Sequence, residues 1–205
     1  MSRYTFLVDT FATEILKVAT VWSQFTDRDL DVRPRADDPR GRSPREHMVH
    51  QCVSENLWFA NMLGIRVTDQ PLPATETRLA FIEHYTRLAN ARWQALGDQD
   101  DAWWEEEVAF FEVQRSRAWV MTRRIAHTAH HRGQQTAMLR ALGGDLHSTY
   151  GPTADTGGLM QNQAPVIYAY PHLEALLAGE RAGGTKAALP GTGPNPPTER
   201  PDSAG

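Results

Sequence analysis

Apolar residues recur every three or four positions along four separate stretches of the chain, and this spacing restricts those stretches to amphipathic helices. We expect the helices to cover about residues 4–25, 43–64, 77–96 and 117–142. Prolines and glycines separate them, because proline breaks a helix interior and glycine readily ends a helix. Four long helices with short or medium connections predict an all-α fold, a four-helix bundle.

The start of the second helix carries the clearest local signal. Ser43 is a good N-cap, Pro44 follows at the first helical position, and Glu46 stands three residues after the serine. This order is typical of a capping box, in which the serine and glutamate side chains bind the free backbone amides of the first turn. The helix is expected to run from there to Gly64.

The remaining segments carry weaker patterns. Residues 98–116 contain the alternating run VAFFEV, which suits a short extended piece, and we assign no sheet to it. The polar stretch that follows residue 144 is expected to wrap over the bundle, and PHLEALLAGE at 171–180 to form a short helix. From residue 181 large apolar residues almost vanish. We therefore expect residues 1–180 to form one domain and residues 181–205 to be a disordered tail.

Composition excludes several classes of partner. The formal net charge is -4, which gives no electrostatic reason to expect nucleic acid or an anionic membrane surface as a partner. No apolar stretch approaches the roughly 20 residues that a membrane-spanning helix needs. Cys52 is the single cysteine, so an intrachain disulfide cannot form. We expect a soluble, cytoplasmic protein.

Two histidines of the fourth predicted helix are spaced for metal binding. His127 and His131 are four residues apart, so they lie one above the other on the same helix face. A third ligand has to come from another helix, and the second helix offers His47 and His50. Their spacing alone does not decide between these two. Three histidines around one ion leave a coordination position open for water or substrate.

An ordinary polar core is the alternative for these histidines. Buried imidazoles without partners destabilise a fold by roughly 1–3 kcal/mol for each unsatisfied group. One metal ion satisfies several of them together, which favours the metal site. His130 points about 100° away from His131 on the same helix, so we expect it near the site or at the surface rather than among the ligands. Thr128 stands where a helical zinc peptidase needs glutamate, which excludes that class.

Two motifs make the chain resemble the DinB-like superfamily of bacterial metal-binding four-helix bundles. The first lies in SPREHMVHQCVSENLWF and the second in HTAHHRGQQTAMLRALG, and the matching positions are Ser43, His50, Glu55, Trp58, His127, His131, Arg132, Gly133 and Gln134. The resemblance implies that His50, His127 and His131 are the metal ligands. It thus selects His50 over His47. It further implies zinc or nickel as the metal and a homodimer as the assembly.

The resemblance also suggests a chemistry. Similar families include thiol-dependent transferases and isomerases, in which the metal converts a low-molecular-weight thiol into the nucleophilic thiolate. A metal-hydroxide hydrolase and a non-catalytic metal-dependent binding or stress-response module are the alternatives. The residues named for the surroundings of the metal or the substrate pocket are Gln134, Glu55, His130 and Tyr150. No catalytic residue beyond the ligands is assigned.

Two side chains near the first motif look reactive but are poorly placed. Glu55 lies five residues from His50, so the helix turns it well away from that ligand. Cys52 lies two residues from His50, on nearly the opposite face, which favours a buried structural thiol over a nucleophile.

Overall fold

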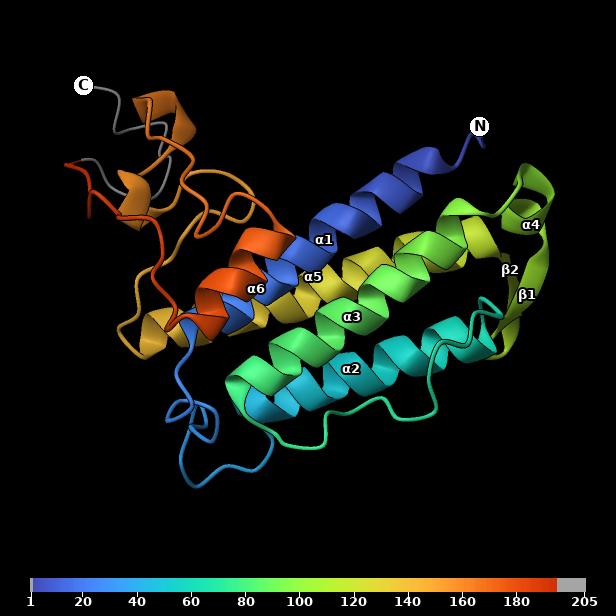
Figure 1. Cartoon of the computed structure of the whole chain (residues 1–205), viewed down its shortest axis with the longest axis horizontal. Helices are drawn as coiled ribbons and strands as arrows, with labels where there is room; N and C mark the ends of the chain where they lie inside the picture. The colour runs from blue at the N-terminus through green and yellow to red at the C-terminus, as the bar shows by residue number, and fades with distance from the viewer. Residues whose placement is uncertain (1, 195–205) are drawn as a thin grey trace.

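The computed structural model describes residues 2–194, and its body is a bundle of four long helices (Figure 1). These are α1 (Thr5–Gln24), α2 (Pro44–Asn61), α3 (Arg78–Gly97) and α5 (Arg117–Ala141). The all-α four-helix bundle expected from the periodicity is confirmed. None of the helices in the described residues is both long and apolar enough to cross a bilayer.

The bundle has a crossover topology. Helix α1 packs against α3 and α5, and α2 packs against the same two, so α1 and α2 occupy opposite corners. Figure 1 shows α1 and α5 running in one direction and α2 and α3 in the other. Residues 62–77, which connect α2 to α3, run back along the length of the bundle. As a result α2 and α5 lie antiparallel beside each other. Their facing sides carry the histidines.

Local signals place the helix ends close to where the sequence predicts them. The capping box is present, since the Ser43 side chain accepts from the Glu46 amide and the Glu46 carboxylate accepts from the Ser43 amide. Helix α2 ends at Asn61 rather than at Gly64. Gly64 instead takes a positive φ of 71°, and the amide of Ile65 then donates to the carbonyl oxygen of Phe59 at 2.8 Å. Glycine adopts this left-handed backbone without the steric penalty that a side chain imposes.

Aromatic side chains fill the centre of the bundle. Trp22 is fully buried, and its ring centroid lies 4.9 Å from that of Tyr85. Its indole nitrogen donates to the Gln135 side-chain oxygen at 3.2 Å, which satisfies the one polar atom of that ring. Phe11 and Phe59 meet across the diagonal, with centroids 5.4 Å apart. The two diagonal helices α1 and α2 therefore touch through the core.

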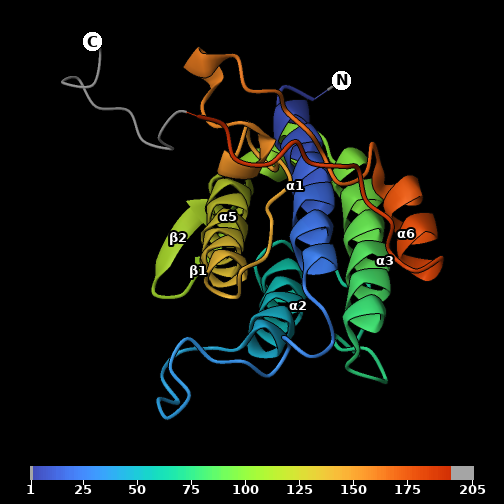
Figure 2. The same ribbon diagram turned by 90° about the vertical axis from the view of Figure 1, so that its left-hand side faces the viewer.

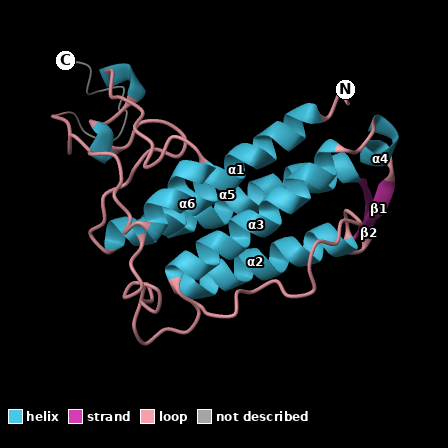
Figure 3. Cartoon of the chain, viewed as in Figure 1, coloured by secondary structure: helices cyan, strands magenta, loops and turns pink. Residues whose placement is uncertain are grey.

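The segment between α3 and α5 departs from the prediction. It forms a short helix, α4 (Asp101–Glu105), and two antiparallel strands, β1 (Glu107–Phe110) and β2 (Val113–Ser116), at one end of the bundle (Figure 3). The extended conformation that the alternation in VAFFEV suits is present, and its pairing into a two-stranded sheet is what the sequence left unassigned. The turn between the strands is Phe111 and Glu112, and Phe111 has a positive φ of 52°, so the usual glycine or asparagine turn signal is missing.

The segment after α5 lies over one end of the bundle. It contains two short 3-10 helices, η1 (Ala154–Thr156) and η2 (Met160–Asn162), followed by α6 (Leu173–Arg181), which packs on α1 and α3. The expected short C-terminal helix is confirmed. Figure 2 shows the chain returning from α6 toward the loops that follow α5. The Ala187 carbonyl oxygen lies 2.8 Å from the His147 ring nitrogen Nε2.

The stretch that follows α6 contains part of the predicted disordered tail, residues 181–205. Residues 182–194 are described and form loops and turns. Residues 195–205 lie outside the described residues, and their disorder stays a prediction.

Candidate metal centre

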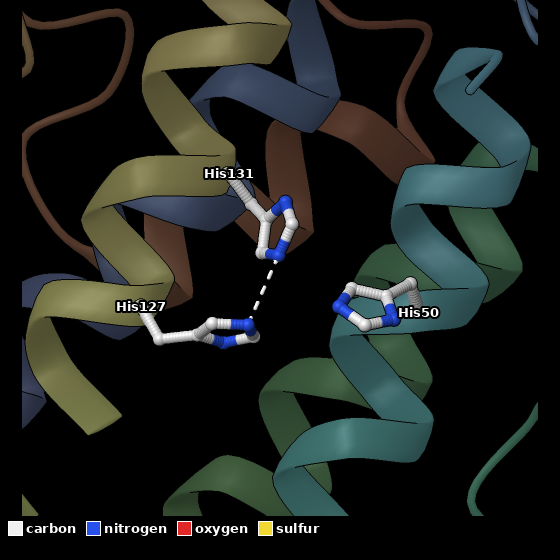
Figure 4. Close-up of side chains that lie close together, drawn as sticks. All are labelled: His50, His127 and His131. Carbon is white, nitrogen blue, oxygen red and sulfur yellow. Dashed lines mark hydrogen bonds between the residues drawn. The ribbon is translucent and has the colours of Figure 1, made fainter. Parts of the chain in front are cut away.

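Three histidines from two helices converge between α2 and α5 (Figure 4). His127 and His131 lie one turn apart on α5, and His50 faces them from α2. One ring nitrogen of each histidine lies within 4.8 Å of those of the other two. The fold thus brings together the set that the sequence motifs indicated.

The spacing of these nitrogens suits a metal ion. The Nε2 atoms of His127 and His131 are 3.2 Å apart. Two imidazole nitrogens bound to one tetrahedral zinc ion lie roughly 3.3 Å apart, because each is about 2.0–2.1 Å from the metal and the ligands subtend the tetrahedral angle. The His50 ring centroid lies 4.6 Å from that of His131 and 5.5 Å from that of His127. The residues present therefore fit a three-histidine site.

Gln134 orients one of the three histidines. Its side-chain oxygen lies 2.9 Å from Nδ1 of His131, one turn along α5. Because an amide oxygen only accepts hydrogen bonds, Nδ1 of His131 carries the proton. The lone pair of Nε2 is then directed at the other two histidines, as in many metal sites where a polar neighbour fixes the tautomer. The expected supporting position of Gln134 matches this contact.

His127 is held by an aromatic ring and a guanidinium group. The Trp58 ring stacks on it, with centroids 5.6 Å apart and an interplanar angle of 20°. Arg124 brings Nη1 to within 3.4 Å of Nδ1 of His127 and also donates to the Ser54 hydroxyl at 3.0 Å. The ring of His127 is therefore fixed by side chains from both α2 and α5.

Glu55 does not reach the histidines. Its buried carboxylate lies between two buried arginines, 3.0 Å from Nη1 of Arg92 and 3.6 Å from Nη2 of Arg124. It bears on the site only through Arg124, which contacts His127. Cys52 is buried next to this cluster, and burial raises the pKa of its thiol. The structural role expected for Cys52 is in keeping with that position.

The other two expected neighbours lie further out. His130 is exposed, with its ring centroid 5.0 Å from that of His131. Tyr150 is 75% exposed, and its ring packs against Lys17 and Arg132 rather than against the histidines. The reason is that Arg132 points toward α1, where it pairs with buried Glu14, and Tyr150 follows it. The structure therefore does not bring Tyr150 to the cluster.

His47 is the neighbour that the choice of His50 left aside. It is buried, its ring centroid lies 5.5 Å from that of His131, and its Nδ1 has no hydrogen-bond partner among the described residues. Its three-residue spacing from His50 is the sequence signal that pointed to this face of α2.

The surroundings keep the imidazoles neutral. Burial, followed by the charge of Arg124, lowers the pKa of His127 to about 4. Burial lowers the pKa of His131 to about 3. Burial first and the charge of Arg42 second lower the pKa of His47 to about 4 and also depress the pKa of His50. Neutral imidazoles are the form that binds metal, so at neutral pH the lone pairs are available.

A cleft of about 1320 Å³ reaches the edge of this cluster at His50. Its walls are residues 32–34 and 39–42 of the α1–α2 connection, the first half of α2 and the C-terminal half of α5. His47, His50 and Gln134 are part of the lining. The cleft is somewhat larger than a typical small-molecule pocket, and a ligand bound in it lies beside His47 and His50.

Comparison with known proteins identifies this architecture. A family model described as the DinB family matches residues 1–161. A crystal structure of a DinB-like protein from Bacillus cereus ATCC 10987 superimposes with a TM-score of 0.61 at 18% identity, covering 70% of this chain and 95% of that one. The DinB-like protein YjoA from Bacillus subtilis gives a TM-score of 0.54 at 13% identity, covering 69% and 94%. At these identities the likeness concerns the fold.

A sequence relative matches a shorter part of the chain. The uncharacterized protein YrdA of Bacillus subtilis (strain 168) is 31% identical over 98 residues. That match covers 47% of this chain and 58% of YrdA, so the chain spans less than two thirds of this relative.

Proposed function

The chain belongs to the DinB family, and from that premise we propose that it binds one divalent metal ion, zinc or nickel, through His50, His127 and His131. The observation that carries the proposal is the convergence of three imidazoles, one of which, His50, lines a large cleft. Imidazole ligands suit both metals. Three protein ligands leave a coordination position for a molecule in the cleft.

The chemistry that we propose for this site is transfer or isomerisation that uses a small thiol. A bound divalent metal stabilises the thiolate form of such a thiol over the neutral form. The chain itself contributes orientation: Gln134 holds His131 with its Nε2 lone pair toward the cluster, and Trp58 covers the face of His127. The cleft admits the thiol and gives its proton a path to solvent.

Among residues 2–194, no unpaired carboxylate lies beside the three histidines, which favours thiol chemistry over metal-assisted hydrolysis. Glu55 is buried between Arg92 and Arg124 and does not contact the histidines. Glu46, which lines the cleft, caps α2 and pairs with Arg33. A base held in two hydrogen bonds or ion pairs is poorly placed to take a proton from water, whereas a metal-bound thiol needs no resident base.

Metal content tests the first part of the proposal. We expect about one zinc or nickel ion per chain in the purified protein or after metal addition, measured by elemental mass spectrometry, and its loss in H127A and H131A. His130→Ala is the matched control, because His130 is an exposed histidine of the same helix outside the cluster. A wild-type protein that takes up neither metal would contradict the proposal.

Thiol binding tests the second part. In cobalt-substituted protein, a small thiol that enters the metal's coordination sphere changes the visible spectrum. We expect such a change with wild type and with H130A. A metal-loaded protein whose spectrum never responds to thiols would instead indicate a binding module without thiol chemistry.

A homodimer is also proposed. It is supported by apolar side chains that the hairpin region leaves at the surface, with Phe111 73%, Val113 44% and Trp119 40% exposed. Exposed apolar patches of this kind are typical of interaction surfaces. Light scattering after size-exclusion chromatography measures the mass, and a monomer at tens of micromolar protein would argue against the dimer.

A further inference from the structure

Arginines dominate one wall of the cleft beside the histidines. The α1–α2 connection and the first turn of α2 place four of them there: Arg33, Arg40, Arg42 and Arg45. This is a local concentration of positive charge in a chain whose formal net charge is -4. Glu46 and Glu76 also line the cleft, so what these charges offer a ligand depends on which arginines are paired.

Three of the four guanidinium groups already have carboxylate partners. The pairs are Arg33 with Glu46, Arg40 with Asp38 at 2.7 Å, and Arg45 with Asp31 at 2.7 Å. Each of these charges is largely balanced within the protein, so it has little attraction left for a ligand.

Arg42 is the exception. It is exposed, and its side chain makes no hydrogen bond or ion pair with any residue between 2 and 194. It lines the same cleft as His47 and His50 and is close enough for its charge to act on both imidazoles. A free guanidinium next to neutral histidines offers a planar pair of donors that fits a carboxylate.

The other residues of the lining indicate which kind of ligand fits the cleft. Val49 and Val53 on α2 face Ala137 and Met138 on α5, which gives the cleft an apolar stretch. The carboxylates in the lining, Glu46 and Glu76, lie beside Arg33 and Arg45 respectively. A ligand with a short apolar middle and one anionic end therefore finds complementary surroundings. The paired N–H donors of one guanidinium fit one carboxylate in a bidentate contact.

We propose that Arg42 is a specificity-determining residue that binds the carboxylate of an acidic small thiol whose sulfur lies at the three histidines. This proposal rests on the thiol function proposed above and names the class of thiol. Arg42 takes no part in bond making. It selects among thiols by charge and holds the far end of the molecule.

Two thiols of matched size test this. 3-Mercaptopropionate carries the carboxylate and 3-mercapto-1-propanol replaces it with a neutral hydroxyl. Dissociation constants are measured on cobalt-substituted protein by visible absorption and on zinc-loaded protein by calorimetry. We expect wild type to bind 3-mercaptopropionate roughly three- to tenfold more tightly, the effect of a charge-assisted contact that water partly screens. Raising sodium chloride from low concentration to about 0.5 M should reduce this preference.

Variants assign the preference to one side chain. Arg42→Gln should bind both thiols equally, through loss of affinity for 3-mercaptopropionate alone. Arg40→Gln is the control from the same wall, and it should keep the wild-type preference because Asp38 already balances Arg40. Both positions are exposed, so circular dichroism melts should match wild type.

The outcomes separate this proposal from the thiol function itself. Equal binding of the two thiols by wild type, or a preference that survives in Arg42→Gln, would overturn the role of Arg42 and leave metal–thiol binding intact. If neither thiol changes the cobalt spectrum or gives heat, the thiol function fails and the role of Arg42 fails with it.

Discussion

Neutralising Glu55 is expected to destabilise the bundle strongly. The carboxylate is fully buried, and the two guanidinium groups beside it, those of Arg92 and Arg124, are each 1% exposed. Glu55→Gln keeps the volume but leaves two buried positive charges without their counter-charge. Removing one partner of a buried ion pair costs about 3–5 kcal/mol of unfolding free energy. For a chain of this size that corresponds to a fall in Tm of roughly 6–20 °C.

The same substitution should reach the histidines. Arg124 also contacts Ser54 and His127. If its guanidinium group shifts toward solvent once the Glu55 charge is lost, it no longer contacts the His127 ring. Urea unfolding of metal-free protein in a chelator measures stability separately from metal affinity. Metal affinity is then measured below the temperature at which the variant begins to unfold.

The control is an ion pair on the surface. Glu83 bonds to Arg181 at 2.6 Å, but their side chains are 38% and 59% exposed. Glu83→Gln is therefore expected to change the unfolding free energy by under about 1 kcal/mol. The reasoning would be refuted if Glu55→Gln lost no more stability than Glu83→Gln, because the buried arginines would then not depend on the Glu55 charge.

Three further outcomes are expected. Ser43→Ala should lower the unfolding free energy by about 0.5–2 kcal/mol in urea titrations, because the capping box is lost; no change would mean that water replaces the cap. Gln134→Leu should weaken zinc or nickel binding roughly 10- to 100-fold in competition titrations with a coloured chelator, since His131 loses the group that fixes its tautomer; unaltered affinity would exclude that role. In metal-free protein, the folded pKa values of about 3 for His131 and about 4 for His47 and His127 lie below their ordinary value. The unfolded chain then binds more protons than the folded one. The unfolding free energy is therefore independent of these histidines above about pH 6.5 and falls as the pH drops toward 4, by up to about 1.4 kcal/mol per pH unit for each histidine. A stability profile that is flat over this range, measured by urea midpoints, would contradict the neutral buried state.

The sequence alone determined the helical elements and one half of the candidate site. Helix periodicity, the capping box at Ser43 and the same-face position of His127 and His131 all depend on residues within one or two turns of each other. Local backbone geometry sets such relations, so they can be predicted from spacing. The supporting contact of Gln134 to His131 belongs to the same class, since it spans three residues of one helix.

The tertiary structure decided the relations between elements. Spacing left His47 and His50 open as the third ligand, and the family resemblance rather than the residue pattern selected His50. Its ring nitrogen approaches His127 and His131 because α2 and α5 lie side by side in a crossover bundle. The hairpin was missed for a related reason. It has no turn signal, and Phe110 packs on Trp58, which is some fifty positions earlier in the chain.

The sequence also could not predict which charged side chains pair with each other. Glu55 is bound by Arg92 and Arg124, and Tyr150 packs on Arg132. Within residues 2–194 Arg42 has no ion-pair partner, whereas Arg40 and Arg45 are paired. Each outcome depends on which side chains of other segments arrive within a few ångströms. Local sequence fixes where a side chain sits on its own helix, but burial and partner distances arise only when the helices pack. The pair His127 and His131 could therefore be predicted from spacing, whereas the position of His50 beside them and the contacts around all three arise only in the fold.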